Sequence, residues 1–189
     1  FQYNYLLIMH EITHVLAFNR SLFKFFINPD TGSKKNLDET LREKVVINGV
    51  EKDLIVSYNV RKKAAEYFNC PSIIGVELES QGGTGSAGSH WEARTMLGDY
   101  MIAQSYSEVY ISEITLALFE DSGWYKVNYY TGGLQKFGNL AGCEFLNKKC
   151  VEEGETLDEI NYCSNDDSFK CLPGRAYRGV CVLGEYESS

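Results

Sequence analysis

Residues 10–18 read His-Glu-Ile-Thr-His-Val-Leu-Ala-Phe, and this stretch decides how the first part of the chain is interpreted. Neither Gly nor Pro interrupts residues 1–19, which favours a single helix over that range. Apolar residues follow helical spacing there, at Leu7, Ile8, Ile12, Val15 and Leu16. Because these neighbours are uncharged, we expect the helix to be buried beneath a functional site.

His10 and His14 are four residues apart, so both imidazoles lie on one face of the predicted helix and can reach one metal ion. A structural core would seldom place two His and a Glu on one apolar helix, because each buried polar group needs a partner. The pattern predicts one catalytic Zn²⁺ with a water in its open position. Glu11 would be the general base that takes the proton of this water and passes it to the leaving amine of a peptide bond.

Catalytic zinc usually has three protein ligands, so a third is needed. The chain has three His, and the one outside the motif is His90, which makes it the leading candidate. The alternative is a Glu on a downstream helix, as in thermolysin-like enzymes, and Glu108 or Glu113 could serve there.

A glycine-rich stretch, residues 81–89, leads directly to His90. Its Gly83 to Gly88 portion formally matches the GxGxxG pattern of dinucleotide-binding proteins. No apolar helix is expected to open at Gly88, and Trp91 follows instead, so the dinucleotide interpretation fails on context. We expect a flexible loop that lets the chain approach the metal.

The remaining patterns predict an α+β fold that is mainly helical. Residues 28–32 carry a turn signal, and the charged residues 33–44 are expected to be solvated. Further expected elements are a β-hairpin over 45–58 around Asn48-Gly49, a helix over 61–68, a strand over 73–78, and a helix over 107–119 that Gly123 ends.

Composition excludes several partners. The net charge of −8 and pI of about 4.9 argue against nucleic acid and against an anionic membrane surface. No transmembrane segment is visible, since the apolar run near the start, residues 5–9, is far shorter than the ~18 residues a spanning helix needs. No signal peptide or initiator Met precedes Phe1, so we expect a piece of a longer protein.

Five of the six Cys crowd the last 47 residues, after Cys70, at positions 143, 150, 163, 171 and 181. An even count in such a cluster favours disulfides and an oxidising compartment over a structural zinc site, because this segment has no CxxC pair and no His. We place a boundary near residue 140, between a catalytic domain, residues 1–140, and the start of a Cys-rich domain, residues 141–189.

Several blocks in order resemble leishmanolysin, the surface metalloprotease family within the metzincins. They are residues 10–18, 64–70, 81–90, Met101, 118–125 and 139–143, and the block Gln-Gly-Gly-Thr-Gly-Ser-Ala-Gly-Ser-His at 81–90 is the most specific. The resemblance covers most of residues 1–150 and implies the lower part of a metzincin catalytic domain: active-site helix, long insertion, Met-turn and a following helix. The N-terminal subdomain of the family would be missing.

The resemblance also implies that His90 is the third zinc ligand and that Met101 forms the Met-turn, although Met96 competes on physical grounds. It implies polypeptide substrates, a secreted or membrane-anchored location outside the cell or at its surface, and a link with cell adhesion. Ala17 departs from the family, which has Gly there, so the helix is expected to end differently. The Met-turn is also altered, with Ile102-Ala103 where a Pro is common. The competing hypothesis is a non-catalytic cell-surface adhesion or binding module with a relic zinc site.

Overall fold

The computed structural model describes residues 2–104, 109–133, 135–152, 155–156, 158–163, 169–172 and 178–182. The helices are α1 (Gln2–Leu16), α2 (Arg20–Phe23), α3 (Tyr58–Phe68), α4 (Ala93–Met96), α5 (Glu113–Asp121) and α6 (Gly142–Asn147). The strands are β1 (Leu41–Ile47), β2 (Val50–Ile55), β3 (Val76–Glu77), β4 (Val151–Glu152), β5 (Glu155–Thr156), β6 (Phe169–Cys171) and β7 (Arg178–Val180). The predicted α+β class is confirmed.

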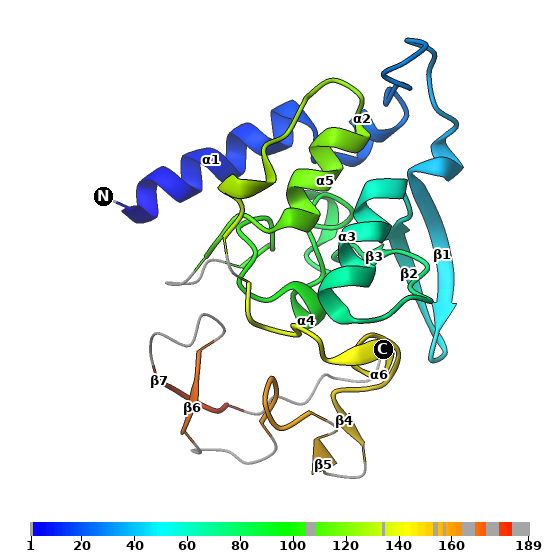
Figure 1. Ribbon diagram of the computed structural model, residues 1–189. Coiled ribbons are helices and arrows are strands. Elements are labelled where there is room, and N and C mark those ends of the chain that lie inside the picture. The colour runs from blue at the N-terminus through cyan, green and yellow to red at the C-terminus, as the bar shows by residue number, and fades with distance from the viewer. Residues whose placement is uncertain are drawn as a thin grey trace.

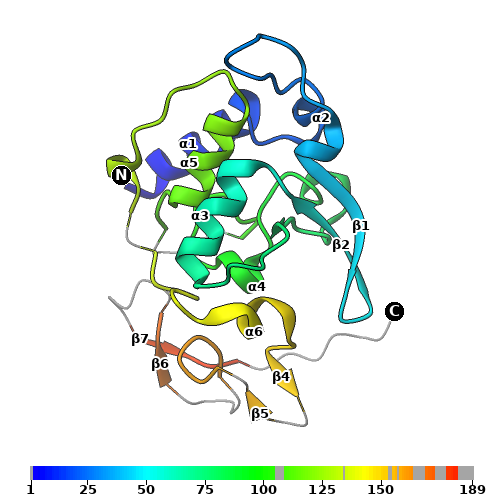
Figure 2. The ribbon, with the colours of Figure 1, turned by 45° about the vertical axis from the view of Figure 1, so that its right-hand side comes forward.

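One antiparallel sheet in the order β1-β2-β3 flanks the helices. The predicted hairpin is confirmed, because Asn48 and Gly49 both have positive φ, 51° and 79°, as a tight turn between twisted strands requires. β1 begins at Leu41, inside the segment expected to be solvated, and Leu41 is buried. In two views α3 lies between this sheet and α5, and α3 packs against α5 (Figures 1 and 2).

A continuous core joins α2, α3, α5 and the loops around Trp91 and Met101. Its largest fully buried side chains include Phe18, Phe23, Phe26, Phe68, Trp91, Met96 and Met101. Burying such aromatic side chains contributes about 1.5–3 kcal/mol each, before the entropy of ordering them. The core therefore fixes the loop around Trp91 and Met101 between α1 and α5.

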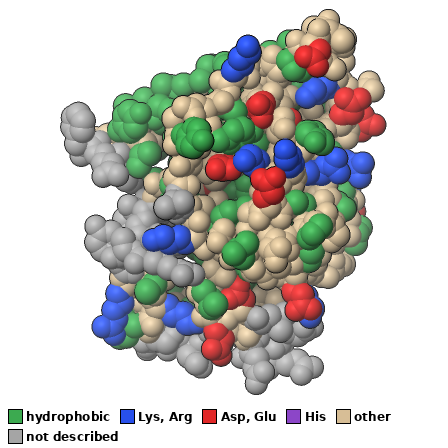
Figure 3. Space-filling model, viewed as in Figure 1, with side chains coloured by type: hydrophobic (Ala, Val, Ile, Leu, Met, Phe, Trp, Pro, Cys, Tyr) green, Lys and Arg blue, Asp and Glu red, His purple; other side chains and the backbone are tan. Residues whose placement is uncertain are grey.

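The expectation that α1 is buried was wrong for most of its apolar residues. Only one stripe of the helix faces the rest of the molecule, with Thr13 buried and Met9 half-buried. Ile8 is 57% exposed and Val15 78% exposed, and hydrophobic side chains follow α1 along the upper left of the molecule in Figure 3. Helical periodicity identifies an apolar face but does not show what covers it.

α1 ends at Leu16, three residues earlier than predicted, and it ends differently from a glycine-capped helix. The Ala17 and Phe18 amides both donate to the Thr13 carbonyl at 3.0 Å, and Ala17 is fully buried. Among the described residues, those other than Gly with positive φ are Lys44, Asn48, Asn69 and Leu140, and Ala17 is not one of them. No left-handed residue is therefore required at Ala17, and the substitution carries no backbone strain.

α5 begins at Glu113, six residues later than predicted, because Ser112 caps it. The Ser112 hydroxyl accepts a hydrogen bond from the Thr115 amide at 3.0 Å, in the manner of an N-cap. Residues 105–108, which include the predicted start of this helix, lie outside the described residues. The predicted end is confirmed: Gly123 has φ +75°, and a Cβ there would lie 2.2 Å from the Ile27 carbonyl oxygen.

Two disulfides are present, as the Cys pattern predicts. Cys70 pairs with Cys143, and Cys163 pairs with Cys181. All six Cys lie among the described residues, and Cys150 and Cys171 are in neither bond. The first disulfide joins the end of α3 to the start of α6, so it ties the Cys-rich segment to the helical part. In both ribbon views α6 and the strands β4 to β7 lie at the end of the molecule away from α1 (Figures 1 and 2).

None of the helices within the described part of the chain combines the length and the apolar character needed to cross a membrane.

Candidate metal centre

Three imidazoles from two distant segments meet at the surface of α1. His10 and His14 come from the helix, and His90 follows the glycine-rich loop. The Nε2 atoms of His10 and His14 are 3.1 Å apart, those of His10 and His90 3.1 Å, and those of His14 and His90 3.2 Å. Within the described residues, this is the cluster of His, Cys, Asp or Glu side chains that could hold a metal ion.

The other ring nitrogen of each histidine is bound to a backbone carbonyl. His10 Nδ1 contacts the Tyr100 oxygen at 2.6 Å, His14 Nδ1 the Phe18 oxygen at 2.8 Å, and His90 Nδ1 the Ser86 oxygen at 2.9 Å. A carbonyl oxygen only accepts, so each Nδ1 must carry the proton and donate it. In the neutral imidazoles all three Nε2 atoms are then unprotonated, and their lone pairs face one another.

Lone pairs that converge in this way repel one another unless a cation lies between them. Three nitrogens on a tetrahedral zinc at the usual 2.0–2.1 Å are separated by about 3.3–3.4 Å, close to the 3.1–3.2 Å separations found here. Carbonyls that orient histidine ligands through Nδ1 are typical of protein zinc sites. The donor set therefore fits one zinc ion held by His10, His14 and His90.

The loop that carries His90 is held at both ends. The Glu79 amide donates to the His90 carbonyl at 2.9 Å, and the Gly88 amide donates to the Glu79 carbonyl at 2.9 Å. Gly82, Gly83 and Gly88 have positive φ, which residues with side chains adopt only at a cost. The loop needs its glycines for this turn, as predicted, and no helix follows Gly88 directly.

Arg20 fixes the same loop from the side of α2. A Cβ on Gly88 would lie 2.7 Å from Arg20 Nη1, so the guanidinium packs directly on the glycine backbone. Arg20 also forms ion pairs with Asp53 on β2, at 2.6 Å, and with Glu43 on β1. The hairpin thereby supports the segment that presents His90.

The pKa of His90 is lowered, first because the ring is buried, and further because His14 and His10 stand beside it. The hydrogen bond to the Ser86 carbonyl opposes this effect. The net direction favours the neutral imidazole, which is the form that binds a metal.

Three glutamates were candidates for the site, Glu11 as the base and Glu108 or Glu113 as an alternative third ligand. Glu11 is exposed on α1, beside His10 in the chain. Glu113 begins α5 and pairs with Lys63 at 2.8 Å, so its carboxylate is engaged outside the histidine cluster. Glu108 lies outside the described residues.

Comparison of the sequence with known proteins places the chain in a family. The family model described as leishmanolysin matches residues 2–189. The chain belongs to the leishmanolysin family. The resemblance seen in the sequence is thereby confirmed.

Individual relatives agree with the family model. The chain is 35% identical to a leishmanolysin homolog of Crithidia fasciculata over 95% of its length, and 30% identical to leishmanolysin of Leishmania donovani over 93%. It is 34% identical to a leishmanolysin-like peptidase of Drosophila melanogaster over 77%. The matches cover 26%, 28% and 25% of these relatives, so the chain spans about a quarter of their length.

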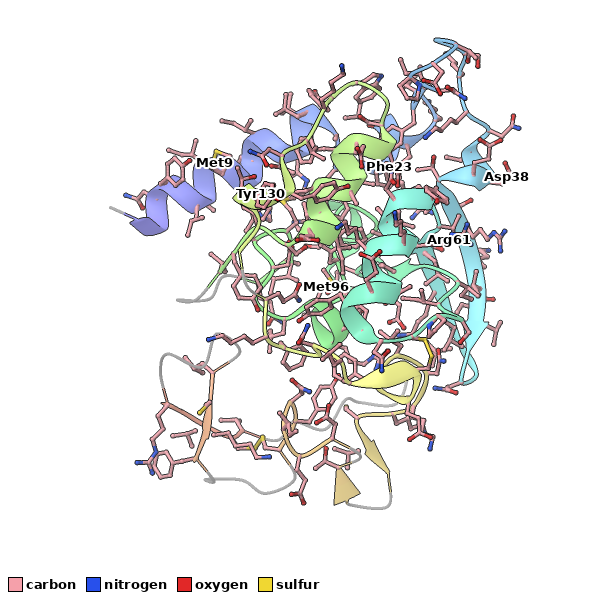
Figure 4. The ribbon with its side chains drawn as sticks, in the orientation of Figure 1. Met9, Phe23, Asp38, Arg61, Met96 and Tyr130 are labelled. Carbon is pink, nitrogen blue, oxygen red and sulfur yellow. A yellow bond between two sulfur atoms is a disulfide. The ribbon has the colours of Figure 1, made fainter. Side chains whose placement is uncertain are left out.

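The segment after His90 that includes Met101 is buried, and it contacts His10 through the Tyr100 carbonyl. Met101 is fully buried, its amide donates to Asp99 at 2.7 Å, and its carbonyl accepts from the Trp91 amide at 3.0 Å. Met96 is equally buried but belongs to α4, where Figure 4 labels it.

Sequence reasoning missed the residues that orient the histidines. Tyr100 supplies the carbonyl for His10, and its hydroxyl contacts Thr13 Oγ1 at 2.8 Å. Ser86 and Phe18 act through their backbones, so no side-chain pattern could have indicated them.

Proposed function

We propose that this chain carries the catalytic centre of a zinc-dependent metalloendopeptidase that hydrolyses peptide bonds in polypeptides. His10, His14 and His90 hold the single Zn²⁺, Glu11 is the general base, and Met101 forms the Met-turn. The observation that carries the proposal is the convergence of three Nε2 lone pairs whose rings are each oriented by a carbonyl.

When bound, zinc supplies a Lewis acid that lowers the pKa of water and polarises a peptide carbonyl. The Tyr100, Phe18 and Ser86 carbonyls keep the three rings in the tautomer that leaves Nε2 free. Glu11 follows His10 on an exposed part of α1, and we assign it to the water at the open side of the cluster. Its carboxylate takes the proton from this water and returns it to the leaving amine.

We further propose that residues 1–140 are the lower part of a metzincin catalytic domain and residues 141–189 the start of a Cys-rich domain. The disulfides fit an oxidising compartment, which supports a secreted or cell-surface location. A link with cell adhesion rests on the family resemblance alone.

The test is cleavage of a denatured protein substrate by the full-length protein. Cleavage that a chelator abolishes and stoichiometric zinc restores is the expected result. Zinc-loaded protein that cleaves no polypeptide would favour the adhesion module with a relic site. Undiminished cleavage after Glu11→Gln would refute the mechanism.

A further inference from the structure

Asp99 is a fully buried carboxylate that the proposed mechanism does not use, and it lies one peptide unit away from a candidate zinc ligand. Its Oδ1 accepts from the Met101 amide at 2.7 Å. Its Oδ2 accepts from the Ser112 amide at 3.2 Å and from the Thr115 hydroxyl at 2.8 Å. Burial raises the pKa of Asp99, and the accepted hydrogen bonds from Ser112, Met101 and Thr115 oppose this rise by favouring the carboxylate.

The bond between Tyr100 and Met101 connects this carboxylate to His10. It is a planar trans unit, so the Tyr100 C=O and the Met101 N–H point in opposite directions. Asp99 accepts from the N–H on one side, and the C=O on the other side accepts from His10 Nδ1 at 2.6 Å. A carboxylate that fixes the N–H therefore also aims the C=O at His10.

The charge on Asp99 also affects the peptide group that lies between Asp99 and His10. Negative charge on Asp99 polarises the peptide, which makes the Tyr100 oxygen a stronger acceptor for the His10 proton. A stronger acceptor at Nδ1 raises the basicity of Nε2, the atom that faces the metal position. In many zinc sites a carboxylate contacts the histidine directly, whereas here a peptide group lies between them.

Capping of α5 does not by itself account for Asp99. The Ser112 hydroxyl already caps that helix by accepting from the Thr115 amide. Burying a carboxylate costs free energy that a purely structural turn need not incur. The contact that the cap leaves unexplained is the one to Met101.

We propose that Asp99 is a positioning residue for the metal centre: it holds and polarises the Tyr100–Met101 peptide so that the Tyr100 carbonyl orients His10. Asp99 touches neither substrate nor metal and acts through this one peptide. The relay presupposes the zinc site proposed above.

The test compares the zinc affinity of the full-length protein with that of Asp99→Asn, by competition with a chromogenic chelator. The asparagine Nδ2 group would face the Ser112 amide and the Thr115 hydroxyl, which are both donors. The two hydrogen bonds that tie the turn to α5 would then be lost. We expect zinc to bind about 10- to 100-fold more weakly, the usual cost of removing a group that orients a ligand. The absorption bands of the cobalt-substituted protein should shift as well.

The matched control is Asp121→Asn. Asp121 is also buried and also accepts three hydrogen bonds, from the Asn59 and Val60 amides and the Asn59 side chain, but it caps α3 instead of the turn. The Asp121→Asn variant should have a lower unfolding temperature. Its zinc affinity should stay within twofold of the wild-type value, and its cobalt spectrum should be unchanged. Equal weakening by both variants would overturn the relay, because the effect would then be one of general stability.

If Asp99→Asn does not fold, Thr115→Val and Thr115→Ser decide. Valine removes the hydroxyl that donates to Asp99 and that accepts from the Trp91 indole N–H at 2.8 Å, and it should weaken zinc binding. Serine keeps the hydroxyl and both contacts, and it should not. Unchanged zinc affinity in Thr115→Val, or in a folded Asp99→Asn, overturns the relay while the proposed function stands. Wild-type protein that binds no zinc overturns both.

Discussion

Glu11 differs from the three histidines in what surrounds it. Each imidazole is held by a backbone carbonyl through Nδ1. Glu11 is exposed, and within the described part of the chain its carboxylate has no hydrogen bond or ion pair. A residue without native contacts contributes little to folding stability. The structure therefore separates the residues that would build the site from the one that would act in it.

Glu11→Gln should leave zinc content and unfolding temperature unchanged and lower kcat on the order of 10²–10⁴-fold, the usual contribution of general base catalysis. Peptide cleavage and metal analysis of the same preparation measure both. Glu113→Gln is the control, because Glu113 pairs with Lys63 and should be dispensable for activity. Loss of zinc from Glu11→Gln would contradict the assignment.

Ala17→Gly tests how α1 ends. Because Ala17 is buried and its backbone is not left-handed, the family's usual glycine should destabilise this chain by about 0.5–1 kcal/mol through added backbone entropy. Denaturant unfolding at constant zinc measures the change. A gain in stability would mean that Ala17 is strained.

Among the helices and strands, sequence signals predicted those features that depend on neighbouring residues in the chain. Asn48-Gly49 predicted its hairpin, and Gly123 predicted a helix end. The start of α5 was missed because the Ser112 hydroxyl caps the helix, while Asp99, 13 residues away, binds the Ser112 amide. Helical periodicity registers neither contact. The strand expected over 73–78 is shortened to β3, Val76–Glu77, and an isolated antiparallel bridge between Leu78 and Trp91 follows it.

Gly123→Ala should destabilise the fold by about 1–3 kcal/mol. The added methyl group would lie 2.2 Å from the Ile27 carbonyl oxygen, and alanine would have to adopt the strained φ of +75°. Gly49→Ala is the matched control, since Gly49 has φ +79° and nothing within 4 Å of the added carbon. The difference between their free energies of unfolding isolates the close approach to Ile27. Equal losses would argue against this packing.

At the scale of the whole molecule, the site depends on segments far apart in the chain. His90 could be anticipated because histidine is scarce, and the glycine-rich block supported it. The backbone carbonyls that orient the imidazole rings could not be anticipated from the sequence, because every residue has a carbonyl. The exposure of α1 could not be predicted either, because periodicity does not reveal which neighbours a helix has.

The Cys70–Cys143 disulfide closes a loop with a sequence separation of 73 between α3 and α6. Replacing both residues by Ser should lower the free energy of unfolding by about 4 kcal/mol, largely through the entropy of the unfolded chain. Cys150→Ser should have almost no effect, because Cys150 is in no disulfide. Thermal unfolding under non-reducing conditions distinguishes the two, and equal effects would refute the pairing.

Three histidines hold one zinc ion in the proposed centre, and metal analysis of the purified full-length protein is the decisive measurement. We expect one zinc per chain, bound through His10, His14 and His90, and loss of this zinc in His90→Ala without loss of the fold. Zinc bound equally well by His90→Ala, or no zinc in the wild-type protein, would contradict it.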